Sequence, residues 1–283
     1  MNEKAFSRRT FGKLSLMAGV LGLSTMSSAA KKKVPVGLQL YTLRDLMKDD
    51  FAGTLAKVAK IGYPAVEFAG YGHLSAAEVR KLLDDLGLEC CGTHEGFDAL
   101  SAEKIDQTIE FNQAIVNPFI ICPSMPGAFR DKGSEGIKAF ADAMNEAGAK
   151  INQAGMQLCY HNHDFEFKPV DGKTIFDWLL ERTEKRLVQI ELDTYWAHYA
   201  GVDPILWIKK LSGRCPLLHM KDLSKTEPRT FAPVGMGIMN IKGIVKAGQQ
   251  IGTRWFVVEQ DRCQGPALEA VSYSFDHLYR LLS

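Results

Sequence analysis

The sequence predicts one closed (β/α)8 barrel of the TIM type, an α/β fold, preceded by an N-terminal export signal. Eight short apolar runs rich in β-forming residues alternate along the chain with segments of helical periodicity. Strict alternation of strand and helix indicates a parallel sheet with helices outside. The chain of 283 residues has room for eight such units, which take about 250 residues. An open doubly wound sheet is disfavoured, because no GxGxxG turn follows the first strand.

The first thirty residues have the pattern of an export signal. Arg8 and Arg9 are followed by an apolar run, Leu14–Met26, and then by the small residues Ser27–Ala30. The run is shorter than the roughly 20 residues that span a bilayer. The alternative to an export signal is an amphipathic N-terminal helix. The paired arginines resemble a twin-arginine signal. We therefore expect recognition by the twin-arginine export machinery, cleavage after Ala30, a periplasmic barrel domain of residues 31–283, and no stable membrane association after cleavage.

The eight predicted strands begin after this signal and divide the chain evenly. They are Val36–Tyr41, Ala65–Ala69, Glu89–Thr93, Phe119–Pro123, Met156–His161, Val188–Asp193, Leu217–Lys221 and Trp255–Glu259. The helices between them carry start and stop signals. Ser75 and Glu78 form a capping box at the start of one helix, and Gly87 ends that helix. Asp203-Pro204 opens a later helix. No linker or charge block divides the chain, so we expect one domain.

Composition excludes several classes of function. Apolar residues make up 46% and charged residues 24% of the chain, an ordinary globular balance. The net charge is +1, and it becomes −2 once the first thirty residues, with four basic and one acidic side chain, are removed. A near-neutral protein has no electrostatic reason to bind nucleic acid. The six cysteines form no CxxC pair and are expected to be buried as small apolar residues.

Polar residues gather at the predicted strand ends, where a barrel of this type keeps its active site. Four of the seven histidines lie there: His94, His161, His163 and His219. Alternation along the strands turns His161 and His163 inward, together with the three further inward groups Asp193, His219 and Glu259. Two imidazoles and two carboxylates predict a divalent metal site that suits Mn²⁺, Co²⁺, Fe²⁺ or Zn²⁺ better than Mg²⁺.

The motifs at these strand ends resemble those of the xylose isomerase-like TIM-barrel superfamily, the sugar phosphate isomerase/epimerase group. The resemblance covers nearly all of residues 34–283 and rests on Gly37–Arg44, Tyr160–Phe167, Leu192–Thr194, Leu218–Asp222 and Val258–Glu259. The ketose 3-epimerase branch holds one metal with a Glu, an Asp, a His and a Glu after strands 5 to 8.

Asp193, His219 and Glu259 match the last three of these ligands. His161 stands where the first Glu is expected, and His163 is the alternative ligand two residues later. The resemblance implies an enediolate mechanism in which the metal polarises a carbonyl.

The resemblance also implies roles for other residues at the mouth. Glu259, His163 and Lys221 would be catalytic. The residues expected to contact substrate are Gln39, Tyr41, Glu67, His94 and Trp196. Glu67 has an alternative role in a salt bridge inside the barrel, for example with Lys221, and Trp196 has an alternative role in packing. Asp222 and Asp261 are expected to orient their neighbours.

The predicted function is that of a metal-dependent isomerase or epimerase acting on a non-phosphorylated sugar or polyol. Because a His replaces one of the two epimerase glutamates, symmetric 3-epimerisation is less favoured. This leaves a keto-sugar lyase or hydratase with the same metal chemistry as the first alternative. A non-catalytic sugar-binding barrel is the second.

Overall fold

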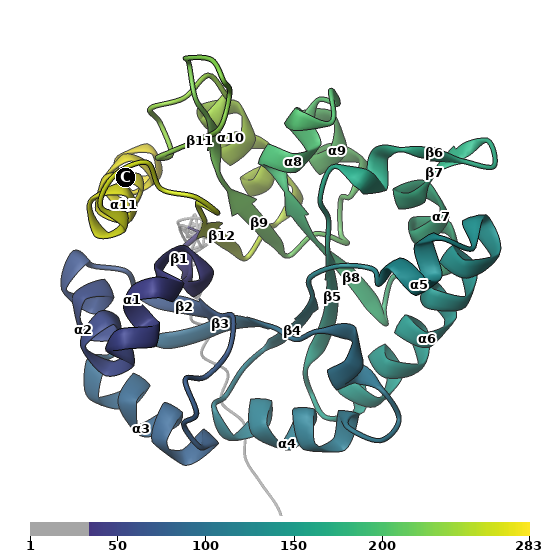
Figure 1. Ribbon diagram of the computed structural model, residues 1–283, viewed down its shortest axis with the longest axis horizontal. Helices are drawn as coiled ribbons and strands as arrows, with labels where there is room; N and C mark the ends of the chain where they lie inside the picture. The colour runs from purple at the N-terminus through teal and green to yellow at the C-terminus, as the bar shows by residue number, and fades with distance from the viewer. Residues whose placement is uncertain (1–33) are drawn as a thin grey trace, which may run out of the picture. The chain divides into compact units, whose positions relative to one another are not determined.

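The structure, a computed structural model, describes residues 34–283. The predicted export signal and its cleavage point lie outside the described residues. The described chain forms a closed barrel of parallel strands surrounded by helices, as predicted (Figure 1).

The eight barrel strands follow each other round the ring in sequence order. They are β1 Val36–Gln39, β2 Ala65–Phe68, β3 Glu89–His94, β4 Phe119–Cys122, β5 Gln157–His161, β8 Val188–Asp193, β9 Leu217–Met220 and β12 Trp255–Val258. The sixth predicted strand coincides with β8, and the other predictions differ at their ends by one or two residues. The largest difference is at β1, where the chain turns after Gln39 into a 3-10 helix, η1 (Leu40–Leu43).

Helices cover the outside of the barrel, and short segments line its rim. The α-helices are α1 Arg44–Asp49, α2 Phe51–Ile61, α3 Ala76–Leu86, α4 Ile105–Ala114, α5 Gly127–Arg130, α6 Gly133–Gln153, α7 Ile175–Arg182, α8 Thr194–Tyr199, α9 Pro204–Lys210, α10 Ile241–Ile251 and α11 Ala267–Leu282. The rim holds two 3-10 helices and two hairpins, η2 Phe97–Leu100, η3 Phe165–Phe167, β6 Pro169–Val170 with β7 Lys173–Thr174, and β10 Asp222–Leu223 with β11 Phe231–Ala232. The capping box of Ser75 and Glu78 is present at α3, and Pro204 opens α9.

The barrel interior has an apolar lower half. Its members, which we call the apolar ring, are Ala65, Cys91, Phe119, Ile121, Cys159, Leu217, Trp255 and Val257. Side chains alternate along a strand, so the residue two positions further on points inward one layer higher. Glu67, His161, His219 and Glu259 each stand two residues beyond a member of the ring. The sequence therefore places a polar layer directly above an apolar one, at the end of the barrel where the strands terminate.

The prediction that the cysteines are buried is confirmed for most of them. Five of the six cysteines are buried, Cys263 is partly exposed, and all six are free thiols. Among residues 34–283, no helix is long and apolar enough to cross a membrane.

Candidate active site

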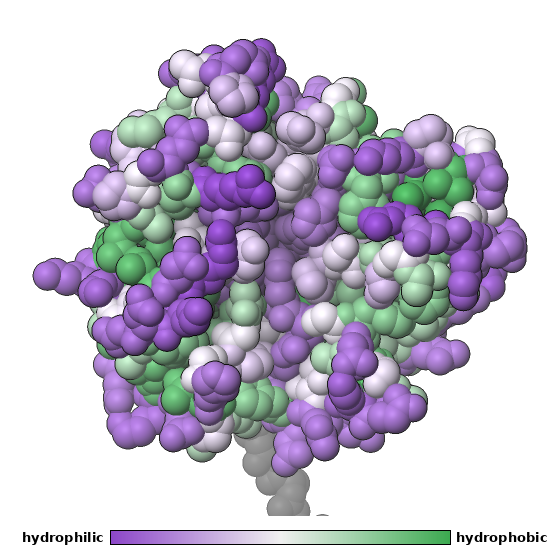
Figure 2. Space-filling model, viewed as in Figure 1, coloured by the Kyte–Doolittle hydropathy of each residue, from purple (hydrophilic) through white to green (hydrophobic). Residues whose placement is uncertain are grey.

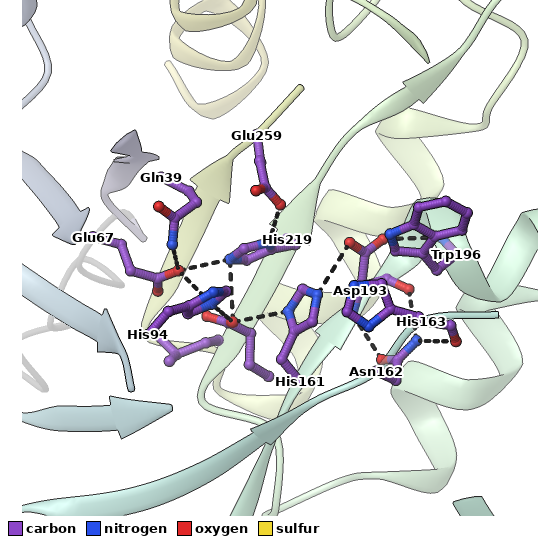
Figure 3. A network of polar contacts seen from close by, with 12 residues as sticks. Gln39, Glu67, His94, His161, Asn162, His163, Asp193, Trp196, His219 and Glu259 are labelled. Carbon is purple, nitrogen blue, oxygen red and sulfur yellow. Dashed lines mark hydrogen bonds and ion pairs between the residues drawn. The ribbon is translucent and has the colours of Figure 1, made fainter. Parts of the chain in front are cut away.

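The deeper part of the polar layer is a group of five side chains, which we call the inner cluster: Glu67, His94, His161, Glu191 and His219. Figure 3 shows the three imidazoles converging, with Glu67 on the side of Gln39. The ring centroids lie 4.6 to 5.4 Å apart. Strand register brings the cluster together, because Gln39 pairs with Glu67 and His161 pairs with Glu191 on neighbouring strands.

Two carboxylate oxygens receive nearly all contacts within the inner cluster. Glu191 Oε2 lies 2.9 Å from His94 Nε2, 3.0 Å from His161 Nδ1 and 3.1 Å from His219 Nε2. Glu67 Oε1 lies 2.8 Å from His219 Nε2 and 3.0 Å from His94 Nε2. Burial opposes ionisation of Glu67, but the charges of His219 and His94 outweigh it and hold its pKa well below the ordinary value.

A second group, which we call the outer cluster, lies nearer the mouth and consists of Asp193, Lys221, Glu259 and Asp261. The Lys221 ammonium is 2.8 Å from Asp193 Oδ2, 2.6 Å from Glu259 Oε2 and 2.5 Å from Asp261 Oδ1. Lys221 is buried, which disfavours its charge, yet these three carboxylates raise its pKa well above the ordinary value. Burial opposes ionisation of Glu259 too, and Lys221 and His219 lower its pKa strongly.

Two histidines join the clusters. His219 presents Nε2 to Glu67 and Glu191, and it presents Nδ1 to Glu259 Oε2 at 2.9 Å. His161 faces Glu191 with Nδ1, and its Nε2 lies 3.7 Å from Asp193 Oδ2. Each ring therefore offers one nitrogen to each cluster.

A cavity of about 320 Å³ opens above the clusters. Its lining comprises Tyr41, Ala69, His94, Pro123, His161, His163, Lys221, Glu259 and Asp261. An adjoining cavity of about 450 Å³ shares Tyr41 and Asp261 with it and is lined in addition by the aromatic rings of Trp196 and Tyr199. Aromatic rings beside polar groups suit the apolar faces and hydroxyls of a sugar. Viewed from the side of Figure 1, hydrophilic residues run along the centre of the molecule (Figure 2).

His163 is held at the cavity wall by a buried loop carboxylate. Glu166 Oε2 accepts a hydrogen bond from the backbone N–H of His163 at 2.8 Å, and Glu166 Oε1 accepts one from the Tyr160 hydroxyl at 2.6 Å. Burial raises the pKa of Glu166 to about 7. Burial and the nearby Lys221 charge lower the pKa of His163 to about 4, so its imidazole is neutral at pH 7.

The predicted site residues separate into three positions. Tyr41, His94, His161, His163, Lys221 and Glu259 line the main cavity. Trp196 lines the adjoining one, and Asp193 and His219 lie just below as cluster members. Gln39 and Glu67, predicted to bind substrate hydroxyls, are fully buried beneath the cavity, where Gln39 Nε2 donates to Glu67 Oε1 at 2.7 Å. Neither side chain lines the cavity, so their expected contact with substrate stays a prediction.

Glu67 forms ion pairs inside the barrel, as the alternative prediction had it, but its partners are His94 and His219 rather than Lys221. Asp261 orients Lys221 as expected. Asp222 lies away from the clusters and accepts hydrogen bonds from the backbone N–H groups of Gly235, Gly237 and Met239, which fixes the loop after β11.

Sequence reasoning assigned no role to Glu191, although a signal was available. Glu191 stands two residues before Asp193 on one strand, so alternation places both on the inward face.

The outer cluster has the donor set of a divalent metal site. Asp193, His219 and Glu259 each bring one ligand atom, and these atoms lie within 4.8 Å of one another. Carboxylate oxygens and an imidazole nitrogen suit Mn²⁺, Fe²⁺, Co²⁺ or Zn²⁺. Three carboxylates surround a single ammonium, so this part of the site carries an excess of negative charge that a divalent ion would balance. The residues present therefore fit a metal.

Comparison with known proteins places the barrel among described families. The family model for xylose isomerase-like TIM barrels matches residues 55–281. A crystal structure of a sugar phosphate isomerase/epimerase from Parabacteroides distasonis superimposes with a TM-score of 0.72 at 28% identity, covering 92% of this chain and 98% of that one. The structure of an L-ribulose 3-epimerase shares the fold, with a TM-score of 0.66 at 15% identity over 87% of this chain and 94% of that one.

Curated relatives by sequence are inosose dehydratases. The protein of Clostridium perfringens is 32% identical over 88 residues, which is 31% of this chain and 29% of that protein. The protein of Geobacillus kaustophilus is 22% identical over 189 residues, or 60% of this chain and 61% of that protein. The chain thus spans less than two thirds of the length of either relative.

Proposed function

This chain belongs to the xylose isomerase-like TIM barrel family, and we propose that it is a metal-dependent isomerase or epimerase of a non-phosphorylated sugar or polyol. The observation that carries the proposal is the outer cluster beneath the cavity. There Asp193, His219 and Glu259 fit a divalent ion, and Lys221 and His163 reach the same space. A non-phosphorylated substrate is proposed for the main cavity, because Lys221, the one lysine or arginine among the described residues lining it, is already paired with three carboxylates. The adjoining cavity is lined by Arg44, Arg229 and Arg262, so the phosphorylated sugars in the panel below test this part of the proposal.

Asp193, His219, Glu259 and His161 would hold the metal. When bound, the ion would polarise the substrate carbonyl and its neighbouring hydroxyl. Glu259 remains ionised beside Lys221, so Oε2 can accept the proton from the carbon next to the carbonyl. Lys221 lines the same cavity, and its positive charge would stabilise the oxygen on which negative charge develops.

His163 supplies the second proton-transfer group. It follows β5, while Glu259 follows β12, and β8 and β9 lie between them in the barrel. The two side chains therefore approach the cavity from different walls. Neutral His163 can accept a proton from a substrate hydroxyl and return it to the neighbouring oxygen. Glu259 then returns its proton to the former carbonyl carbon, and the carbonyl has moved by one carbon. The aromatic rings of Tyr41 and Trp196 would hold the sugar ring.

A dehydratase is the second candidate, favoured by the inosose dehydratase relatives. The same proton abstraction by Glu259 is then followed by departure of a hydroxyl, which takes its proton from the Lys221 ammonium and leaves as water. One site supports both outcomes, because the first step is shared.

The experiment uses residues 31–283 loaded with Mn²⁺, Co²⁺ or Zn²⁺ and a panel of ketoses, aldoses and inososes, with phosphorylated counterparts included. We expect NMR in D₂O to show deuterium at the carbon beside the carbonyl together with an isomerised sugar. Ultraviolet absorbance with loss of water would instead identify the dehydratase. Glu259→Gln should abolish deuterium incorporation, and exposed Glu269→Gln is the matched control. Binding of sugars with neither deuterium exchange nor product would refute catalysis and leave a sugar-binding barrel.

Export to the periplasm by the twin-arginine route remains part of the proposal. It is supported by the sequence pattern of residues 7–30. Phosphorylated sugars are poor periplasmic nutrients, so this location agrees with a non-phosphorylated substrate.

A further inference from the structure

We propose that the inner cluster is a second metal site, separate from the ion assigned to the reaction. It would hold a divalent transition metal, zinc by its ligand types, through His94 Nε2, His161 Nδ1, His219 Nε2 and Glu191 Oε2, with Glu67 Oε1 beside them. The proposal does not depend on the reaction proposed above.

The contacts of the two glutamates are uneven in a way that hydrogen bonding alone does not explain. Glu191 Oε2 has three imidazole nitrogens within 3.1 Å, whereas an oxygen of this kind has two lone pairs. Over the same described residues, Glu191 Oε1 and Glu67 Oε2 have no hydrogen-bond partner, although both are buried. Buried polar atoms without a partner are rare in proteins, so these two oxygens call for an explanation.

The imidazole protons are also too few for the contacts. His94 Nε2 lies within 3.0 Å of both Glu67 Oε1 and Glu191 Oε2, and His219 Nε2 lies within 3.1 Å of the same two oxygens. Each nitrogen carries at most one proton, so one contact of each pair has none. Nitrogen lone pairs and carboxylate oxygens directed at one point are the arrangement of ligands around a cation.

Charge and spacing agree with an ion at that point. Within residues 34–283, the side chains paired with Glu67 and Glu191 in salt bridges are histidines alone, and Lys221 pairs with the outer cluster. Among these residues, the countercharges of the two buried carboxylates therefore come from histidine protons, which a divalent ion would replace. Tetrahedral zinc with bonds of about 2.0–2.1 Å needs its ligand atoms roughly 3.3 Å apart. The nitrogen–oxygen separations of 2.8 to 3.1 Å are close to this value, and the ligand atoms of His94, His161, Glu191 and His219 all lie within 4.8 Å of one another. Small side-chain shifts would bring them onto one ion.

An ion could reach the inner cluster from the cavity, and it would use other ligand atoms than an ion in the outer cluster. His94 lines the main cavity and is 12% exposed, whereas His161 and His219 are 2% or less exposed. An ion would therefore enter past His94. His219 gives Nε2 to the inner cluster and Nδ1 to the outer one, so two ions would not compete for one atom.

Metal stoichiometry tests the proposal directly. Purified protein is loaded with Zn²⁺, freed of excess ion and analysed by mass spectrometry. We expect two equivalents in the wild type, one in Glu191→Gln and one in Asp193→Asn. Asn at 193 keeps an oxygen for the N-cap of α8, which Asp193 Oδ1 provides by accepting from the Trp196 N–H. His73→Asn, at an exposed position with φ of 68°, is the control for loss of a histidine and should keep both ions.

X-ray absorption at the zinc edge of Asp193→Asn gives a readout that needs no inner-cluster variant. The remaining ion should show three imidazole ligands, whereas an ion in the outer site has at most two. Full metal content in Glu191→Gln, or fewer than three imidazoles in Asp193→Asn, would overturn the inner site. A single equivalent that is lost in Glu191→Gln and kept in Asp193→Asn would support the inner site and refute the outer one. Absence of turnover on all sugars would refute the proposed function and leave the inner ion unaffected.

Discussion

Replacing Lys221 with Met should show how strongly the outer cluster depends on its one ammonium. The Met side chain has similar length and no charge, so Asp193, Glu259 and Asp261 would face each other without a partner. All three now lie within 2.8 Å of Lys221 Nζ, and Lys221 is 1% exposed. Breaking a buried ion pair by removing one partner costs about 3–5 kcal/mol. At about 2–4 °C per kcal/mol for a domain of this size, Tm in EDTA should fall by about 6–20 °C.

A divalent ion should reverse much of this loss. In the wild type the ammonium and the ion share the same carboxylate oxygens, so added Mn²⁺ or Zn²⁺ should raise the Tm of Lys221→Met more than that of the wild type. Differential scanning fluorimetry with EDTA and with each ion measures both effects. Lys210→Met is the matched control, because Lys210 forms an exposed pair with Asp177 at 2.7 Å, and such pairs contribute about 0–1 kcal/mol. An unchanged Tm in EDTA, or equal responses to the ion, would refute the reasoning.

Three further predictions concern other parts of the chain. The raised pKa of Glu166, about 7 against an ordinary 4.5, means that the folded protein keeps a proton which the unfolded chain releases. The free energy of unfolding should therefore fall by about 3 kcal/mol from pH 4.5 to 7. Urea unfolding at several pH values should show a smaller fall for Glu166→Gln than for the wild type, and an equal fall in both proteins contradicts the assignment. Gly92→Ala should cost about 1–3 kcal/mol by chemical unfolding, because a Cβ there would lie 2.7 Å from Glu67 Oε2; wild-type stability would show that the polar layer yields easily. The double substitution Arg8→Lys and Arg9→Lys should keep the precursor in the cytoplasm of a bacterial host, as measured by cell fractionation. Continued export of this variant would exclude the twin-arginine route.

Local patterns were sufficient to predict the barrel and most residues of the mouth. Strand–helix alternation gave the architecture, and two-residue alternation correctly turned His161, Asp193 and His219 inward. These predictions depend only on the geometry of a single strand. The ends of the strands were less certain, since the turn after Gln39 is set by η1 rather than by any apolar run.

Strand alternation does not predict how deep a side chain lies in the barrel or which side chain it contacts. Gln39 and Glu67 were expected to contact substrate, yet both side chains are fully buried and neither lines the cavity. Lys221 meets Asp261 from the neighbouring strand, and His94 meets Glu191 across the barrel. Such pairs depend on the stagger of the closed sheet, which no single segment of the sequence encodes.

The apolar ring closes the lower end of the barrel, so the two clusters and the cavity open only at the mouth. Water, sugar and ions reach them through the mouth, past the exposed edge of His94, and whatever enters must leave the same way. A sugar bound in the cavity would therefore cover an ion held below it. Chelators should strip that ion more slowly while the cavity is filled, so the residence time of a ligand at the mouth would set the rate of metal exchange beneath it.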